Sequence, residues 1–410
     1  MNILYINHYA GSISHGMEYR PYYLAREWVQ QGHNVVIVAA NYSHIRTHNI
    51  AMLDNGQYKT EMIDGIKYIW CKTPEYPGNG IKRLINIFTF LYRLKQLTPN
   101  LLKSFKPDMV IASSTYPFDT IIAAQIAKIT KAKFIYEVHD LWPLTPMELG
   151  GMSKYHPFIW LMQKAEDFGY RNADKVVSLL PKAKEYMQEH GMSADKFVCI
   201  PNGVSVRDYQ QMQQSPQSLD KNYQQQIQQI KQKHHFLIGY AGGMGESNAL
   251  KYLLSAVTKI KDQQFAIVLV GDGSCKLDLI KQSQAANITN VFFLDPISKN
   301  QIPDFLSQMD ALYIGWNNLP IYRFGISPNK LFDYMLASKP IIHSVTAGND
   351  LVAEANCGIS VPAEDITAIA NAIMQMISTA ESQRQKWGQN GYQYGIHHHD
   401  YEILSRRFFA

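Results

Sequence analysis

Two stretches of this 410-residue chain, one in each half, follow the same local pattern: a short apolar strand, a glycine-containing turn, a helix and a second apolar strand. In the first half the strand is 2–7 (NILYIN), the turn is 8–16, and the returning strand is 34–40 (NVVIVAA). In the second half the strands are 236–241 and 265–270. Fully apolar strands joined by helices are typical of parallel sheets. The pattern therefore predicts an α/β protein with two doubly wound domains.

Further apolar runs alternate with helical segments and extend both predicted sheets. A polar stretch at 58–71 is predicted as a hairpin that turns at Asp64 and Gly65. The remaining predicted strands are 108–112, 134–138 and 175–179 in the first half and 291–294, 311–314 and 340–343 in the second.

A Gln-rich stretch separates the two patterns. Residues 196–204 (KFVCIPNGV) read as a last strand and a turn, and the following residues 209–235 have little apolar surface to bury. We therefore expect a first domain over 1–205 and a linker with a surface helix over 206–235. The second domain follows from residue 236.

Composition excludes several classes of protein. Hydrophobic residues make up 46% and charged residues 18%, and no apolar run is long enough to span a bilayer. The apolar start has no basic leading segment or cleavage site, so a cytoplasmic location is expected. A net charge of +5 is too small to indicate nucleic-acid binding. The cysteines are too far apart for a zinc site or disulfide framework and read as buried thiols: Cys71, Cys199, Cys275 and Cys357.

The stretch 325–342 (GISPNKLFDYMLASKPII) predicts a helix whose amino end suits an anion. Pro328 fits the first turn, where free N–H groups carry the positive end of the helix dipole. Lys330 adds a full charge, and Asp333 lies one turn later, where a carboxylate can accept hydrogen bonds from hydroxyls. Phosphate and diol together indicate a nucleotide. The alternative is an ordinary amphipathic helix.

Three other features lie where strands are predicted to end. The turns GGMGES (242–247) and GDG (271–273) allow close approach of backbone amides to a phosphate, although such turns are a weak signal alone. His139 and Asp140 follow a predicted strand at the ligand-binding edge of a parallel sheet, which favours a functional pair over a structural one. The loop 8–16 lies at the same edge, but a plain turn is the commoner explanation.

The segment 81–105 predicts a long basic helix without a single acidic residue. Such a helix suits an anionic membrane surface, and a core helix with a basic outer face explains it equally well. The tract His397 to Asp400 resembles a metal site, but consecutive histidines on a helix point in different directions, so no metal is expected there.

The motifs together, in chain order, resemble family 4 glycosyltransferases of the GT-B fold. They are YINHYAGSISHGMEYRPYYLAREWVQQGHNVVIV, EVHDLW, IPNGV, GYAGGMGESNALKYLL, VGDG and SPNKLFDYMLASKPII. Within that family, the chain is most similar to the N-acetylfucosamine-type transferases of O-antigen and capsule assembly.

The resemblance implies two Rossmann-like domains facing across a cleft, with the second domain over 236–390 and a C-terminal helix over 391–410 that packs back on the first. It implies a nucleotide-sugar donor, UDP-linked, on the second domain. A glycan or polyprenyl-diphosphate-linked acceptor belongs mainly to the first domain. It also implies transfer with retention of configuration, without metal or other cofactor, in the cytoplasm. Peripheral contact with the inner face of the cytoplasmic membrane, through 81–105, is the accompanying expectation.

The resemblance also implies roles for individual residues. Asp333 stands where the family places the glutamate that holds the ribose, and His139 matches a histidine close to the transferred sugar. The catalytic residues are expected to be His139, Lys330 and Asp140. The loop on the acceptor side is expected to use His8, Gly11, Ser12 and Gly16. The donor-binding residues are expected to be Gly242, Gly243, Gly271, Asp272, Gly273, Arg323, Ser327, Pro328, Asn329, Lys330, Leu331 and Asp333.

The chain departs from the family pattern at several charged positions. Gly325 stands where the first of two paired acids is expected, and Asp333 replaces the second, a glutamate. The family's arginine and lysine, which neutralise the diphosphate, would fall at Gly243 and Asn248. Lys330, Arg323 and the helix dipole are the available substitutes. These departures keep two alternatives open: a nucleotide-sugar 2-epimerase of the same architecture, and a non-catalytic subunit that binds a nucleotide sugar.

Overall fold

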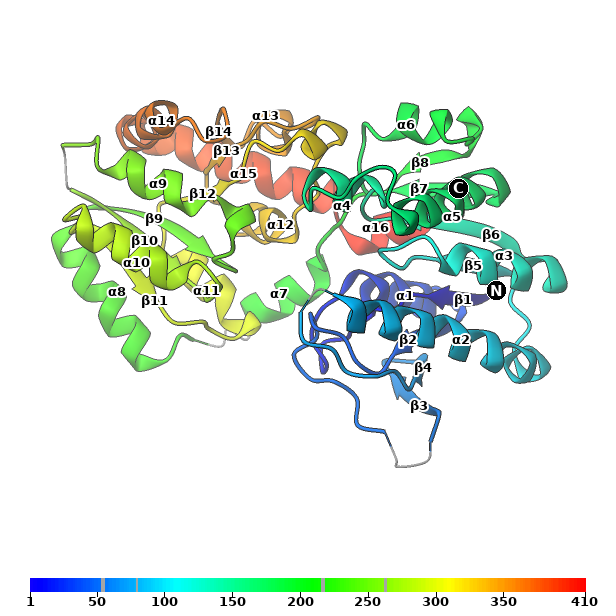
Figure 1. Cartoon of the computed structure of the whole chain (residues 1–410). Coiled ribbons are helices and arrows are strands. Elements are labelled where there is room, and N and C mark those ends of the chain that lie inside the picture. The colour runs from blue at the N-terminus through cyan, green and yellow to red at the C-terminus, as the bar shows by residue number, and fades with distance from the viewer. Residues whose placement is uncertain (53–55, 79, 215–217, 262–263) are drawn as a thin grey trace. The chain divides into compact units, whose positions relative to one another are not determined.

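The computed structural model describes residues 1–52, 56–78, 80–214, 218–261 and 264–410, which form two compact units (Figure 1). The first unit comprises Met1–Asn202 and Tyr401–Ala410, and the second comprises Gly203–Asp400. The chain therefore leaves the first unit after Asn202 and returns to it after Asp400. The segment expected as a linker belongs to the second unit, except that residues 215–217 lie outside the described residues. Residues 391–400 also belong to the second unit.

The first unit is built on an eight-stranded sheet with the order β3-β4-β2-β1-β5-β6-β7-β8. All neighbouring strands are parallel except β3 and β4, which form the predicted hairpin around Asp64 and Gly65. The strands are β1 Asn2–Ile6, β2 Asn34–Ala40, β3 Tyr58–Ile63, β4 Ile66–Cys71, β5 Met109–Ala112, β6 Lys133–Val138, β7 Lys175–Ser178 and β8 Phe197–Cys199. The helices are α1 Arg20–Gln30, α2 Ile81–Ser104, α3 Asp119–Thr130, α4 Leu144–Glu148, α5 Pro157–Asn172, α6 Lys184–Glu189, η1 Ala194–Lys196 and α16 Tyr401–Arg406.

The chain's last residues complete the core of the first unit. Helix α16 packs against α1, where Tyr401 stacks on Tyr23 with ring centroids 5.0 Å apart. Phe408 is buried against Trp28, and the Trp28 indole N–H donates to the Ser405 carbonyl. The core of this unit is therefore assembled from both ends of the sequence.

The second unit has a six-stranded, fully parallel sheet with the order β11-β10-β9-β12-β13-β14. Its strands are β9 Phe236–Ala241, β10 Phe265–Val270, β11 Val291–Leu294, β12 Ala311–Gly315, β13 Ile341–Ser344 and β14 Gly358–Val361. Its helices are α7 Val206–Gln214, α8 Lys221–Lys233, η2 Glu246–Asn248, α9 Leu250–Val257, α10 Lys276–Ala285, η3 Lys299–Gln301, α11 Ile302–Ser307, η4 Pro320–Phe324, α12 Asn329–Leu336, α13 Leu351–Glu354, α14 Ile366–Ser378 and α15 Glu381–His398.

The second unit has two hydrophobic cores, one on each face of its apolar sheet. Every residue of β9, β10 and β12 is buried, and alternate residues enter opposite faces of the sheet. One face is covered by α9 and α14, and the other by α11, α12 and α13. Both predicted doubly wound α/β domains are thereby confirmed. The helix order places the amino end of α12 beside the strands' carboxyl ends, where ligands bind in such folds.

Helix α2 has two different sides, one buried in the core and one exposed. Asn86, Ile87, Phe90, Leu94 and Leu101 are buried, so one side of the helix belongs to the core. A second side exposes a stripe of apolar side chains at spacings of three and four residues: Ile81, Ile85, Phe88 and Tyr92. Within the described residues, no helix has the length and apolar character needed to cross a bilayer.

Candidate active site

In the second unit, two glycine turns pack directly on each other at the carboxyl ends of β9 and β10. Gly242 and Gly271 have φ angles of +147° and +142°, which residues with a side chain rarely adopt. A Cβ atom on Gly271 would lie 2.0 Å from the Gly242 carbonyl oxygen, and one on Gly242 would lie 3.1 Å from Lys330 Nζ. The glycines therefore make room for a neighbouring turn and for the lysine.

The Lys330 ammonium is held by two neutral groups. Its Nζ donates to the Tyr240 hydroxyl and to Asn248 Oδ1, both at 2.5 Å, and lies 4.3 Å from the centre of the Tyr240 ring. Tyr240 in turn donates to the Gly243 carbonyl at 2.5 Å. No carboxylate of the described residues forms an ion pair with Lys330. Burial without such a partner lowers the pKa of Lys330 to about 7.

Helix α12 begins at Asn329, one residue later than predicted. Pro328 has an extended ψ of 128° and is the N-cap residue, so it lies outside the first turn. The amides at the start of α12 have no acceptor within the helix and carry the positive end of its dipole. The Leu331 side chain is fully buried in the core and its amide donates to the Pro328 carbonyl at 3.2 Å, so Leu331 is not available to a ligand. The cationic site therefore combines Lys330 with the start of α12.

Asp333 lies one turn along α12 and has an uncommitted carboxylate. The residue is half-buried, and its carboxylate makes no hydrogen bond with a described residue. Burial raises its pKa, an effect that nearby Lys299 partly offsets. A carboxylate without a protein donor is suited to accept hydrogen bonds from ligand hydroxyls. This arrangement fits the expected contact with a ribose.

The segment before α12 explains the absent acid at position 325. Gly325 has a φ of +106°, and its amide donates to the Tyr322 carbonyl at 2.9 Å. An acidic residue would be strained in that conformation. Arg323 is exposed, donates to the Pro320 carbonyl at 2.6 Å and places its guanidinium over Phe324. Asp272 is also exposed, and its Oδ1 accepts from the Gly273 amide at 2.8 Å.

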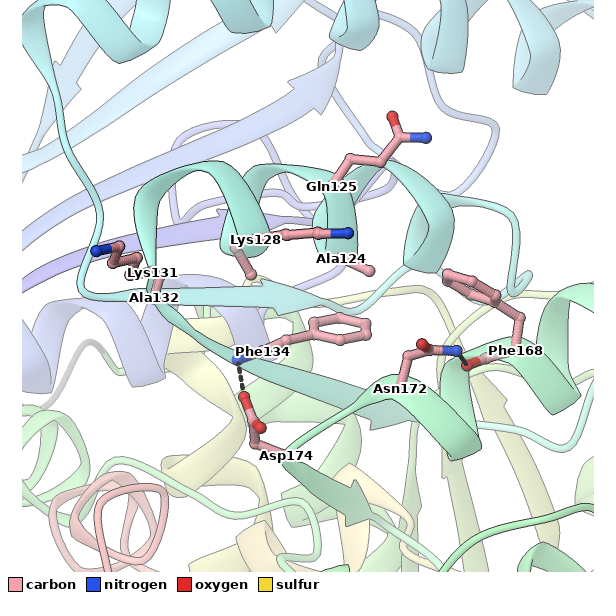
Figure 2. Close-up of a pocket in the computed structure, with 10 residues that line it drawn as sticks. Ala124, Gln125, Lys128, Lys131, Ala132, Phe134, Phe168, Asn172 and Asp174 are labelled. Atoms are coloured by element: carbon pink, nitrogen blue, oxygen red, sulfur yellow. Dashed lines mark hydrogen bonds between the residues drawn. The ribbon is translucent and has the colours of Figure 1, made fainter.

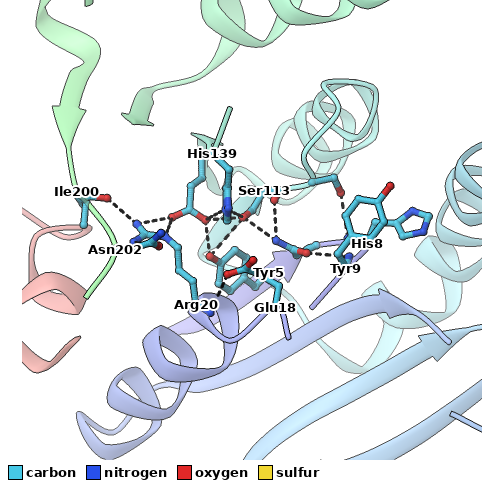
Figure 3. A network of polar contacts seen from close by, with 12 residues as sticks. Tyr5, His8, Tyr9, Glu18, Arg20, Ser113, His139, Ile200 and Asn202 are labelled. Carbon is cyan, nitrogen blue, oxygen red and sulfur yellow. Dashed lines mark hydrogen bonds and ion pairs between the residues drawn. The ribbon is translucent and has the colours of Figure 1, made fainter. Parts of the chain in front are cut away.

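In the first unit, polar side chains meet at the carboxyl ends of β1, β5 and β6. Figure 3 shows Arg20, Tyr5, Ser113 and His139 directed toward one another. Their common partner is Glu137, whose carboxylate ion-pairs with Arg20 at 2.9 Å. It also accepts from Ser113 at 2.5 Å and from Tyr5. This edge of the sheet therefore contains a buried charged network that was not predicted from the sequence.

His139 contacts Glu137 instead of its sequence neighbour Asp140. Its Nε2 lies 2.9 Å from Ser113 Oγ and 3.3 Å from Glu137 Oε2. The Asp140 residue is exposed. The expectation that Asp140 tunes His139 is therefore better met by Glu137. One signal was present: an acid inside the apolar run FIYEV must be paired if that strand is buried.

The four residues expected on the acceptor side, in the loop 8–16, are buried and shape the loop from within. His8 is fully buried, with Nδ1 2.6 Å from the Tyr116 hydroxyl. A Cβ atom on Gly11 would lie 1.8 Å from the Gly16 carbonyl oxygen. Ser12 Oγ lies 2.8 Å from His15 Nδ1, and Ser12 and Gly16 form an antiparallel bridge. These four residues thus form the buried scaffold of the loop, and Ile13 and Ser14 between them are exposed.

Two other features lie apart from these edges. A pocket between α3 and α5 is lined by Phe134, Phe168 and Asp174 (Figure 2), near the amino ends of β6 and β7 and thus at the opposite edge of the sheet. Among the described residues, Glu166, Asp167 and His190 have potential metal-ligand atoms within 4.8 Å of one another. The Gln163 amide nitrogen donates to both acids.

Within the histidine tract, His397 and His398 are exposed and only His399 is buried. His399 is 3% exposed and stacks on Phe332 with ring centroids 4.2 Å apart.

Comparison with known families agrees with this two-unit architecture. The "Glycosyl transferase 4-like domain" matches residues 15–203, and "Glycosyl transferases group 1" matches residues 235–379. The two matches follow each other in chain order and cover most of the sequence. The chain therefore belongs to the glycosyltransferases of family 4 and group 1, which have the GT-B fold.

Relatives with known names are distant but extend over most of the chain. The putative colanic acid biosynthesis glycosyl transferase WcaI of Escherichia coli K12 is 23% identical over 86% of both chains. Anabaena HepE, solved with UDP and glucose, is 14% identical, with a TM-score of 0.65 over 100% of this chain and 98% of HepE. WaaG, a glycosyltransferase involved in lipopolysaccharide biosynthesis, is 13% identical, with a TM-score of 0.66 over 99% and 98%.

Proposed function

We propose that this glycosyltransferase moves an N-acetylated sugar from a UDP-sugar to a glycan or polyprenyl-diphosphate-linked acceptor during assembly of a bacterial surface polysaccharide. The names of WcaI and WaaG support a role in polysaccharide assembly, and the HepE complex supports a UDP-linked donor. The resemblance to N-acetylfucosamine-type transferases supports an N-acetylated sugar.

The observation that carries the proposal is the ammonium of Lys330. A half-buried cation among neutral partners lacks the counter-ion that such groups normally have. It lies at the amino end of a helix and beside two glycine turns, where a diphosphate is favoured by charge and by backbone donors. Asp333 is then one turn away, for the ribose hydroxyls. The site thus has a cation and backbone donors for the diphosphate, and a hydrogen-bond acceptor for the ribose hydroxyls.

The proposed mechanism is departure of UDP from the sugar, stabilised by Lys330 and the α12 dipole. These groups replace charge that the chain lacks at Gly243 and Asn248, and no metal is required to compensate the leaving group. The acceptor hydroxyl attacks from the face that UDP leaves, so the configuration is retained. We assign His139 to the transferred sugar or its phosphate.

A lipid-linked acceptor is supported by the outer surface of α2. Its exposed apolar stripe, Ile81, Ile85, Phe88 and Tyr92, is accompanied by exposed lysines at Lys82, Lys95 and Lys103. Apolar side chains with flanking cations favour binding to an anionic membrane surface. We propose that α2 makes this contact peripherally, at the inner face of the cytoplasmic membrane.

The test is a thermal-shift panel with UDP, GDP, ADP, dTDP and CMP in EDTA, followed by UDP-release assays with N-acetylated UDP-sugars. A ligand at one hundred times its dissociation constant adds about 2.7 kcal/mol of stability, which raises the melting temperature measurably. We expect UDP alone among the nucleotides to stabilise the protein and acceptor to accelerate UDP release. Sugar conversion without acceptor would instead indicate an epimerase, and stabilisation without any turnover would indicate a binding subunit.

A further inference from the structure

The buried carboxylate of Glu137 divides its two oxygens between a cation and a set of polar groups. Oε1 accepts from Nε and Nη2 of Arg20, each at 2.9 Å. Oε2 accepts from Ser113 and Tyr5 and lies 3.3 Å from His139 Nε2. Both Glu137 and Arg20 have fully buried side chains. Because both oxygens have fixed partners, the carboxylate is held in one orientation toward the histidine.

Arg20 is fixed in turn by the last residues of the first unit before the chain leaves it. Its Nη2 donates to the Ile200 carbonyl at 2.8 Å and its Nη1 donates to the Pro201 carbonyl at 2.6 Å. These bonds give Arg20 a structural role that accounts for the ion pair with Glu137. They do not account for the second oxygen of Glu137, which is directed at His139.

The two ring nitrogens of His139 have different surroundings. Nε2 lies between Ser113 Oγ at 2.9 Å and Glu137 Oε2 at 3.3 Å. Nδ1 makes no hydrogen bond with a described residue, and the side chain keeps 13% of its surface exposed. A carboxylate beside one ring nitrogen places a proton on that nitrogen. Nδ1 is therefore the nitrogen left for a ligand.

We infer that Glu137 is a positioning residue that holds His139 as an imidazolium, with Nε2–H toward the carboxylate and Nδ1–H available to an oxygen of the substrate. The identity of that oxygen, on the transferred sugar or its phosphate, rests on the proposed function. The orientation of the ring and its carboxylate partner rest on the first unit's geometry alone. Glu137 would thus act on substrate only through His139.

Charged groups from several elements surround His139. Burial alone would lower its pKa, but the hydrogen bond to Glu137 and the charge of that group, together with Glu18 before α1, outweigh burial and raise the pKa. Arg20 on α1 acts in the opposite direction. Asp140 follows β6 directly and lies close enough to feel the charge of His139. An imidazolium is populated below its pKa, so its contribution is lost as pH rises through that raised value.

The test is an NMR titration of the His139 imidazole in the full-length wild type and in Glu137→Gln, with His139→Asn to assign the signal. We expect His139 to titrate above the ordinary value of about 6.5 in the wild type, and at least about one unit lower in Glu137→Gln. A wild-type value at or below the ordinary one would overturn the inference. So would an unchanged value in folded Glu137→Gln. The wild-type titration decides the matter even if that variant does not fold.

A second variant and an activity readout separate positioning from plain structure. Ser113→Ala removes a hydroxyl that contacts both His139 and Glu137, and should lower the His139 pKa in the same direction. In the transfer assay, the alkaline limb of kcat should move to lower pH in Glu137→Gln, and Glu137→Asp should restore part of the shift. An unmoved limb would contradict the inference. If the His139 pKa is lower in Glu137→Gln but the wild type shows no transfer activity, the proposed function is refuted and the positioning role of Glu137 remains.

Discussion

Asn248 accepts a hydrogen bond from the Lys330 ammonium at 2.5 Å, although the two residues are 82 positions apart. At position 248 the resemblance to family 4 enzymes leads to the expectation of a lysine. In this chain, helix α12 brings an ammonium next to that position from a different element. A cation thus lies beside position 248, although it comes from a distant part of the sequence.

The Asn248 contact predicts the effect of adding a negative charge there. Asn248→Asp should weaken UDP binding by about tenfold or more, because the carboxylate neutralises the ammonium and repels the diphosphate. Asn248→Ala is the matched control, which removes one neutral hydrogen bond and should cost about 1 kcal/mol. Calorimetric titration with UDP measures both. Equal losses in the two variants would show that the charge of Lys330 is irrelevant.

Donor binding should depend on pH above neutrality. With a pKa of about 7 in the free protein, Lys330 loses its proton as pH rises through that value. A bound diphosphate favours the charged form, so binding at higher pH takes up a proton and UDP affinity falls, by at most about tenfold per pH unit. Titration near pH 8 in two buffers of different ionisation enthalpy measures the uptake. Lys330→Arg, which is always charged, should flatten the dependence.

The C-terminal segment should stabilise the first unit. Phe408 is 1% exposed and its ring centroid lies 5.1 Å from that of Trp28. Phe408→Ala should therefore lower the free energy of unfolding of this unit by about 3 to 5 kcal/mol. Urea unfolding followed by tryptophan fluorescence measures the change for the transition of the first unit. Arg406→Ala, at an exposed site of the same segment, should change it by less than about 1 kcal/mol.

Charge reversal on α2 tests the proposed membrane contact. Replacement of Lys82, Lys95 and Lys103 by glutamate should reduce binding to anionic liposomes, since each cation near such a surface contributes about 1 kcal/mol. Lys128 and Lys131, which are exposed on and just after α3, provide a control pair for the same reversal. Co-sedimentation measures the bound fraction. If both sets of substitutions have the same effect, α2 has no special role.

Much of the fold could be predicted from the sequence because local patterns determine it. Apolar runs such as 34–40 and 265–270 became strands with the expected limits, and Asp64 with Gly65 formed the expected hairpin turn. The start of α12 was wrong by one residue, because proline suits both the N-cap and the first turn and the backbone angle alone decides between them.

The charged partners of the site could not be predicted, because they depend on contacts between distant segments. Arg20 and Glu137 are 117 positions apart, and nothing in either local sequence names the other. Asp140 was expected to pair with His139 because it follows His139 directly, whereas Glu137, two residues earlier, makes the contact. Alternate residues of an extended segment lie on the same face, and successive ones do not. Lys330 could be identified from its place at the start of a predicted helix. Its partner Tyr240 could not, because the two residues meet only when β9 packs near α12.

Calorimetric titration of UDP into the wild type and Lys330→Met, in EDTA at about pH 6.5, tests the central claim most directly. We predict that the wild type binds UDP without metal, and that Lys330→Met binds about tenfold to one hundredfold more weakly, as expected when a charge-assisted hydrogen bond is lost. Equal affinity in the two proteins, or no binding of UDP by the wild type, would contradict the assignment of Lys330 as the diphosphate ligand.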